Sequence, residues 1–214
     1  MKITDAARCR RSLYLLSFED GTQVSVDLRT FDESPYGVGR DISSEELEEL
    51  LSRSMYNRAR ERALYLLGVR DYACGELEKK LQPEATPEVA AQVVARLQEV
   101  GLLDDERYAA RMAVSLSEYK GMPRRRVEQE LCRRGVAAET ARAAAAEIDT
   151  EDFEQALALI RKKYYNKMND PADRQRVAAA LGRRGFSYTA VRQAMERFYE
   201  EQDTDNEELE EPWQ

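Results

Sequence analysis

Two stretches that lie fifty residues apart decide the fold: RVEQELCRRGV, from Arg126 to Val136, and RVAAALGRRGF, from Arg176 to Phe186. Six of the eleven positions carry the same residue in both, namely Arg-Val at the start, one leucine, and Arg-Arg-Gly near the end. Apolar residues at helical spacing followed by glycine are typical of a short helix and its C-terminal cap. Because the same helix ending occurs twice, we predict that the chain contains tandem structural repeats.

The similarity extends along the chain on both sides of the two stretches. A longer helical pattern precedes each copy, and a further short one follows it with apolar residues at the same offsets. A fainter earlier copy places Leu77 and Leu81 fifty residues before the matching residues of the second. We predict three tandem three-helix repeats, at 58–103, 104–150 and 151–200, whose short helices depend on their neighbours for burial.

The first part of the chain is predicted to contain β structure. RSLYLLSF and TQVSVDL flank an Asp-Gly pair, which is typical of a β-hairpin turn. In the following DISSEELEELL, Ser43 and Glu46 form the pattern of a helical capping box. We therefore predict a β-hairpin region at 1–42 and a connecting helix at 43–57. The fold class is mainly α, with tandem three-helix repeats in an elongated array after a small N-terminal β-hairpin region.

The net charge of −8 is distributed unevenly along the chain. The segment from Glu200 to Gln214 holds eight acids and no base, and we predict that 201–214 is an acidic disordered tail with Leu209 and Trp213 as its adhesive points. By contrast, 120–142 holds seven bases against three acids, and 161–197 holds ten against three. The middle and late parts of the chain are therefore locally basic.

The composition argues against an enzyme. The chain has no histidine, no phosphate-binding GxxxxGK[ST] loop and only three widely spaced cysteines. The successive acids Asp104, Asp105 and Glu106 are interpreted as the cap and first turn of a helix rather than as a metal site. We expect no catalytic residue, metal or cofactor. No run approaches the roughly 18 apolar residues of a membrane helix, and we expect no secretion signal, hence a cytoplasmic protein.

The repeated Arg-Arg-Gly admits two explanations. Glycine after a helix and arginine in its last turn are explained by capping alone. Capping does not require two arginines, however, and further bases precede both copies, so the bases could form a positive stripe suited to phosphate or to an acidic protein surface. The candidate contact residues are Arg124, Arg125, Arg126, Arg133, Arg134, Lys162, Lys163, Arg174, Arg176, Arg183 and Arg184.

Three segments, taken in order and spacing, resemble the RecX family of bacterial regulatory proteins: ALYLLGVRDYACGELEKKL, LQEVGLLDDERYAARMA and GMPRRRVEQELCRRGV. The most specific piece is GLLDDERYA followed about ten residues later by KGMPRRRVEQELCRRG, and the resemblance covers about residues 10–198. It implies a modular helical protein that lodges in the groove of the RecA filament. Such proteins inhibit the ATPase, strand-exchange and co-protease activities of RecA, so they modulate recombination, DNA repair and the SOS response.

The resemblance also implies partners. We expect a monomer that binds the RecA filament, and single- or double-stranded DNA without sequence preference and with strong salt dependence. The first repeat has Pro83 and Glu84 where the later copies have paired arginines, so contacts are expected in the second and third repeats. The alternative is a RecA-independent helical DNA-binding protein or a protein-interaction scaffold.

Overall fold

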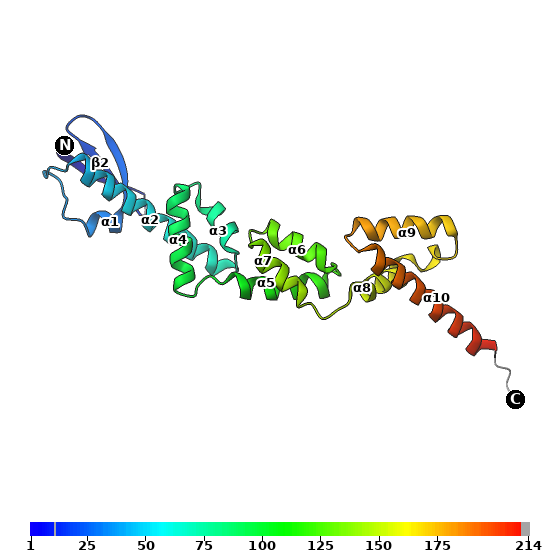
Figure 1. Ribbon diagram of the computed structural model, residues 1–214. Coiled ribbons are helices and arrows are strands. Elements are labelled where there is room, and N and C mark those ends of the chain that lie inside the picture. Colours follow the sequence, from blue (N-terminus) through cyan, green and yellow to red (C-terminus); the bar gives the residue numbers. More distant parts are fainter. Residues whose placement is uncertain (11, 211–214) are drawn as a thin grey trace. The chain divides into compact units, whose positions relative to one another are not determined.

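The structure is a computed structural model that describes residues 1–10 and 12–210 (Figure 1). It divides into two compact units, Met1–Asp104 and a second that begins at Asp105. The first unit contains a small sheet and four helices: β1 (Ile3–Arg10), β2 (Leu13–Phe18), β3 (Gln23–Asp27), α1 (Leu28–Asp32), α2 (Ser44–Val69), α3 (Cys74–Leu81) and α4 (Pro87–Glu99). Each unit contains its own clusters of buried hydrophobic residues.

The sheet is antiparallel with the strand order β1-β2-β3. β2 and β3 form the predicted hairpin, and its turn contains Gly21 at a φ of +81°, in the left-handed region that favours glycine. β1 could not be predicted from its sequence, because ITDAARCR lacks an alternating apolar pattern. Ile3 is the only buried residue among 3–9, the part of β1 whose burial is described, and it joins Leu16, Val26 and the first turns of α2 in one core.

Helix α2 is one continuous helix and corrects the predicted boundary at 57/58. Its capping box of Ser43 and Glu46 is present as predicted. Its first half packs on the sheet through Leu47 and Leu50, whereas its second half packs against α3 and α4 through Ala59, Ala63 and Leu66. The helix continues across the boundary because no glycine or proline occurs between Ser44 and Gly68.

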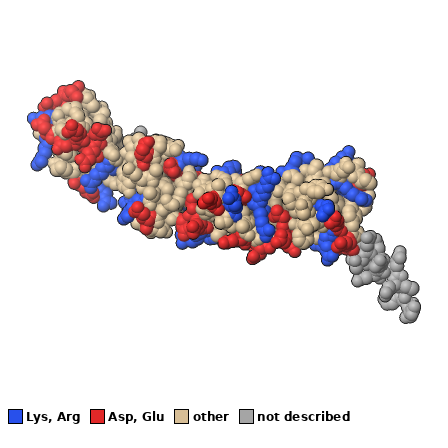
Figure 2. Space-filling model, viewed as in Figure 1, with Lys and Arg blue, Asp and Glu red and all other residues tan. Residues whose placement is uncertain are grey.

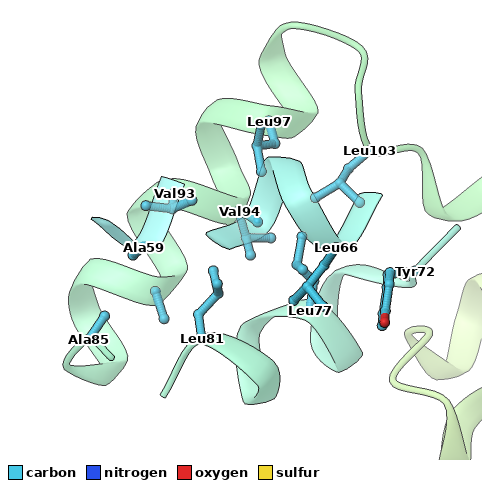
Figure 3. Packing of buried hydrophobic residues seen from close by; sticks show 12 residues of the cluster. Ala59, Leu66, Tyr72, Leu77, Leu81, Ala85, Val93, Val94, Leu97 and Leu103 are labelled. Carbon is cyan, nitrogen blue, oxygen red and sulfur yellow. The ribbon is translucent and has the colours of Figure 1, made fainter. Parts of the chain in front are cut away.

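The second half of α2, with α3 and α4, forms the first three-helix bundle (Figure 3). Its core consists of apolar residues of all three helices together with Tyr72 and Leu103 from the flanking loops. Leu77 and Leu81 of α3 are completely buried, as their match to the later copies predicts. Gly101, at a φ of +73°, ends α4 in a cap in which Leu102 N–H donates to Leu97 C=O at 2.9 Å.

The second unit contains two more three-helix bundles. The second bundle consists of α5 (Asp105–Val114), continued by the π-helical turn η1 (Ser115–Tyr119), α6 (Arg124–Arg133) and α7 (Ala138–Ala146). The third bundle consists of α8 (Asp152–Leu159), the turns η2 (Ile160–Tyr164) and η3 (Tyr165–Lys167), α9 (Pro171–Arg183) and α10 (Tyr188–Glu210). The predicted fold class, with three tandem three-helix units after a small β region, is confirmed.

Buried polar contacts join the second and third bundles. Gln155 of α8 donates to the Ser117 hydroxyl of η1 at 2.6 Å, and both side chains are buried. Nearby, Asp152 of α8 accepts a hydrogen bond of 3.0 Å from the backbone N–H of Arg124, the first residue of α6. The start of one bundle thus supplies a carboxylate to the helix N-terminus of the preceding bundle.

Helix α10 differs from the predicted acidic tail. It continues as a helix to Glu210, which differs from the disorder predicted for 201–210, whereas 211–214 and the predicted adhesive residue Trp213 lie outside the described residues. Arg161 of η2 forms a bidentate ion pair with Glu201, with an Nε–Oε2 distance of 3.1 Å, and Tyr165 donates to Gln202. These contacts hold the beginning of the acidic segment against the third bundle.

Candidate functional site

The two Arg-Arg-Gly turns have the same backbone geometry. Gly135 and Gly185 have φ values of +88° and +102°, and each directly follows the C-cap residue of its helix, Arg134 or Arg184. Val136 N–H donates to Leu131 C=O at 3.1 Å, and Phe186 N–H donates to the matching Leu181 C=O at 3.3 Å. These apolar residues are all buried. The repeated Val, Leu and Gly are therefore explained by packing and capping.

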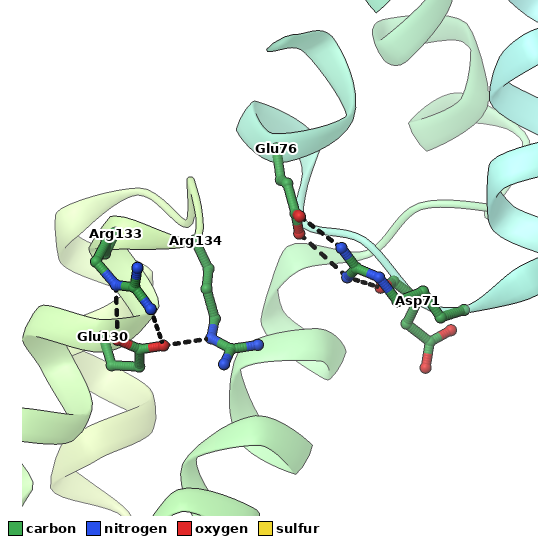
Figure 4. Close-up of polar contacts among 6 residues, drawn as sticks. Asp71, Glu76, Glu130, Arg133 and Arg134 are labelled. Atoms are coloured by element: carbon green, nitrogen blue, oxygen red, sulfur yellow. Dashed lines mark hydrogen bonds and ion pairs between the residues drawn. The ribbon is translucent and has the colours of Figure 1, made fainter. Parts of the chain in front are cut away.

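In the second bundle, both arginines of the turn are paired with one carboxylate. Arg133 donates from Nε and Nη2 to the two oxygens of Glu130, each at 2.8 Å, and Arg134 Nε donates to the same carboxylate at 2.9 Å (Figure 4). The hydrogen bonds from Arg133, joined by those from Arg134, lower the pKa of Glu130 to about 2. Much of the positive charge predicted for this turn is therefore balanced internally.

In the third bundle, the corresponding arginines have no such partner. The residue at the position of Glu130 is Ala180. Arg183 and Arg184 are exposed, and within residues 1–10 and 12–210 neither guanidinium forms a hydrogen bond or an ion pair. Two turns with nearly the same sequence thus present different charge to solvent.

Two of the predicted contact residues have structural roles. Arg124 donates to Ile148 C=O at 2.7 Å and contacts the Glu151 carboxylate at 3.4 Å. Arg174, at the matching position of the third bundle, donates to Met168 C=O at 2.9 Å, and its guanidinium lies 4.9 Å from the centre of the Tyr199 ring. Both arginines close loops within the second unit, which limits their availability to a partner.

The other predicted contact residues differ in whether their basic side chains form hydrogen bonds or ion pairs within the chain. Arg176 is paired with Asp173 at 2.8 Å but remains largely exposed, and Arg126 makes a single long contact, 3.5 Å, with the amide of Gln129. Arg125 of α6 and Lys162 and Lys163 of η2 are exposed and have no hydrogen bond or ion pair within the described part of the chain.

The structure brings the start of α6 against the end of α9. A methyl group placed on Gly185 would lie 3.2 Å from Cβ of Arg126 and 3.5 Å from Cγ of Pro123. The exposed bases at these two helix ends therefore lie close together, and we call Arg125, Arg126, Arg183 and Arg184 the basic junction. Figure 2 shows a band of Lys and Arg crossing the second unit between the parts that carry α6 and α9.

The first bundle has no counterpart to the paired arginines. Glu84, which takes the place of an arginine, lies 3.9 Å from Arg62 of α2. At the end of α2, Arg70 pairs with Glu76 (Figure 4). The Arg70 guanidinium also lies 3.7 Å from the centre of the Tyr72 ring. The first bundle thus differs from the later two at this turn, and the concentration of contacts in the later bundles stays a prediction.

Two exposed aromatic residues of the second unit are not among the contacts predicted from the sequence. Tyr119, at the end of η1, and Tyr188, at the start of α10, are each 83% exposed. Tyr164 and Tyr165 lie among basic residues in the sequence. Tyr164 is half-buried, whereas Tyr165 is about half exposed and packs its ring edge-on against Phe198. Tyr188 could have been recognised because it follows the Arg-Arg-Gly turn where the second repeat has Ala138.

The described residues hold no group of three or more acids or cysteines placed to bind a metal ion. Asp105 and Glu106, two of the three successive acids, lie in the first turn of α5, where their negative charge stabilises the helix N-terminus. Within the same residues, no helix is both long and apolar enough to cross a membrane.

Comparison with known families assigns all three bundles. The sequence models of the first, second and third three-helix domains of RecX match residues 59–97, 104–144 and 149–195, together more than half of the chain. This chain belongs to the RecX family. The three matches follow one another in the order of the three bundles, as the repeated helix endings predict.

Individual RecX proteins support the assignment. Regulatory protein RecX of Trichlorobacter lovleyi is 37% identical over 141 residues, which cover 63% of this chain and 92% of that protein. RecX of Streptococcus sanguinis is 26% identical over 96% of this chain and 80% of its own length. A crystal structure of regulatory protein RecX shares the fold with a TM-score of 0.65 at 19% identity, over 91% of this chain and 98% of that one.

Proposed function

We propose that this protein binds the RecA nucleoprotein filament and inhibits its ATPase, strand-exchange and co-protease activities. It would thereby modulate recombination, DNA repair and the SOS response. The observation that carries the proposal is membership of the RecX family of regulatory proteins, with all three RecX domains matched in order. Because that filament forms in the cytoplasm, we infer that the protein acts there, as a monomer.

The proposed mechanism is steric and electrostatic and involves no catalytic residue of this chain. Three-helix bundles in tandem contact neighbouring filament protomers, and exposed guanidinium groups engage acidic protein surface or the phosphates of bound DNA. Protomers held in this way cannot complete the movements linked to ATP turnover.

The candidate contact residues can be ranked by whether each basic side chain already pairs with a carboxylate of this chain. A guanidinium already bonded to a carboxylate must give up that bond before it can bind a partner, whereas an unpaired one binds without that cost. We therefore place the contacts on the bases that pair with no acid of residues 1–10 and 12–210, which are Arg125, Arg126, Lys162, Lys163, Arg183 and Arg184. Arg133, Arg134 and Arg176 contribute less, and Arg124 and Arg174 maintain the fold.

Binding to DNA alone is proposed to be non-specific, because arginines at helix ends suit phosphate contacts better than the reading of base edges. Each phosphate contact makes such binding weaker as salt rises. Sequence-specific binding in the absence of RecA would instead favour the alternative, a RecA-independent DNA-binding regulator.

The proposal is tested by following ATP hydrolysis by RecA on single-stranded DNA while this protein is added. RecA from the same organism is used, and amounts of the added protein stay well below those of RecA. We expect progressive inhibition, because one bound molecule obstructs several protomers. Unchanged hydrolysis would reject RecA inhibition as the function.

A further inference from the structure

The third bundle carries an apolar groove between α9 and α10. The groove encloses about 580 Å³ and is lined by residues of both helices, among them Ala178, Gly182, Phe186, Val191 and Met195. Tyr188 and Tyr199 lie at its two ends along α10. An open apolar groove on the surface of a small helical protein is a candidate binding surface.

The second bundle provides an internal comparison, because its residues lie fifty positions earlier. There the groove positions of α6 carry Glu128, Gln129 and Cys132 in place of Ala178, Ala179 and Gly182. Glu128 pairs with Arg142 of α7 at 3.7 Å, so polar side chains join the two helices across this face. The three-helix fold therefore does not require an apolar groove at this place. The third bundle has the groove, and the second bundle does not.

The shape of the groove fits a helix. Its α10 side extends from Tyr188 to Tyr199, three helical turns or about 16 Å at 1.5 Å per residue. On its α9 side, Arg174 and Gln175 lie at one end, and the small residues Ala178, Ala179 and Gly182 allow a second helix to approach closely. Three apolar side chains spaced at i, i+3 or i+4, and i+7 would fill such a groove.

The charge around the groove favours an acidic partner. Of the charged residues that line it, Arg192 pairs with Glu196 at 3.6 Å and Arg174 is held by Met168 C=O, so the charge available to a partner comes from the neighbouring turn. Arg183 and Arg184 follow Gly182 directly in the chain, are exposed, and have no partner within residues 1–10 and 12–210. Carboxylates near that end would gain charge-assisted hydrogen bonds.

We propose that the groove between α9 and α10 binds an amphipathic helix of a partner protein, with its apolar face in the groove and acidic residues toward Arg183 and Arg184. Arg183 and Arg184 are also proposed contacts of the RecA filament, but peptide binding is measured without RecA or DNA, so its failure and the failure of the proposed function are distinguishable.

The probes are two fluorescein-labelled synthetic helical peptides of about four turns, both with leucine at i, i+4 and i+7. One carries glutamates in its first turn, and the other carries glutamines at the same positions. Binding to the full chain is measured by fluorescence anisotropy, and the NMR signal of the Met195 methyl group, assigned with Met195→Leu, reports occupation of the groove. The acidic peptide is expected to bind about tenfold more tightly than the neutral one, equal to about 1.4 kcal/mol.

Gly182 supplies a variant pair that separates binding from folding. Gly182 is helical, and nothing lies within 4 Å of an added Cβ, so Gly182→Ala and Gly182→Gln both favour the helix. Only the glutamine side chain is long enough to obstruct the groove. We expect Gly182→Gln to weaken peptide binding about tenfold with no loss of thermal stability, and Gly182→Ala to leave it nearly unchanged.

The outcomes are distinct. Equal binding of the two peptides, no binding up to about 1 mM, or full binding by Gly182→Gln would overturn the proposal. An oligothymidine that displaces the acidic peptide, shifts the Met195 signal and loses affinity in Gly182→Gln would assign the groove to single-stranded nucleic acid instead.

Discussion

At the scale of single residues, one neighbour decides what a pair of arginines can do. Arg133 and Arg134 follow Glu130 by three and four positions, the spacing at which side chains meet on a helix. At the same place Arg183 and Arg184 have Ala180. The difference was visible in the sequence, yet the repeated Arg-Arg-Gly led to the same prediction for both turns.

Gly185 is expected to be intolerant of any side chain. Its φ of +102° is costly for other residues, by about 1–2 kcal/mol, and an added Cβ would press on Arg126. Gly185→Ala should therefore lower the free energy of unfolding by at least that amount in urea titrations. Gly182→Ala is the matched control and should raise it by about 0.5–1 kcal/mol; similar effects at the two positions would contradict this account.

Glu130 should make stability depend on pH. The folded-state pKa of about 2 lies below the ordinary value of 4.5, so its contribution is fully present above pH 4.5 and is lost as pH falls toward 2. Because Arg133 is largely exposed, we expect a contribution of about 1 kcal/mol or less. Wild type should unfold at higher urea than Glu130→Gln at neutral pH, and the gap should close below pH 4.5; a constant gap would argue against the ion pairs.

At the scale of helices and strands, patterns with strong local causes were predictable. The Asp-Gly hairpin, the Ser43 capping box and the glycine caps depend on neighbouring residues, and all are present. Elements that depend on distant partners were missed. β1 is held by pairing with β2, and α1 begins at Asp27, whose carboxylate caps Thr30 while its N–H donates to Ser54 of α2.

The contact between Ser117 and Gln155 is expected to stabilise the joint between the second and third bundles. Ser117→Ala leaves the buried Gln155 amide without its acceptor and should cost about 1–3 kcal/mol of unfolding free energy. Ser117→Ala combined with Gln155→Met should recover most of the loss, because both polar groups are then removed. Chemical denaturation of the two single variants and the double variant measures this; strictly additive losses would show that the bond does not couple the bundles.

At the scale of the whole molecule, the net charge of −8 hides a locally basic region. Composition predicted that basic region, and the three-helix repeats were predicted from their spacing. The sequence could not show that the first residues of α6 lie against the turn that follows α9, because that proximity results from packing within the second unit. The basic junction is therefore a property of the fold, and its unpaired members belong to both bundles.

The most direct test of the central claim compares two matched double variants in the RecA ATPase assay on single-stranded DNA. Arg183→Gln with Arg184→Gln removes guanidinium groups that have no partner in the described part of the chain, and Arg133→Gln with Arg134→Gln removes groups already held by Glu130. Circular dichroism confirms that both remain folded. We predict that the third-bundle variant needs at least about tenfold more protein for half-inhibition, whereas the second-bundle variant stays close to wild type. Full inhibition by the third-bundle variant, or a greater loss in the second-bundle variant, would contradict the account.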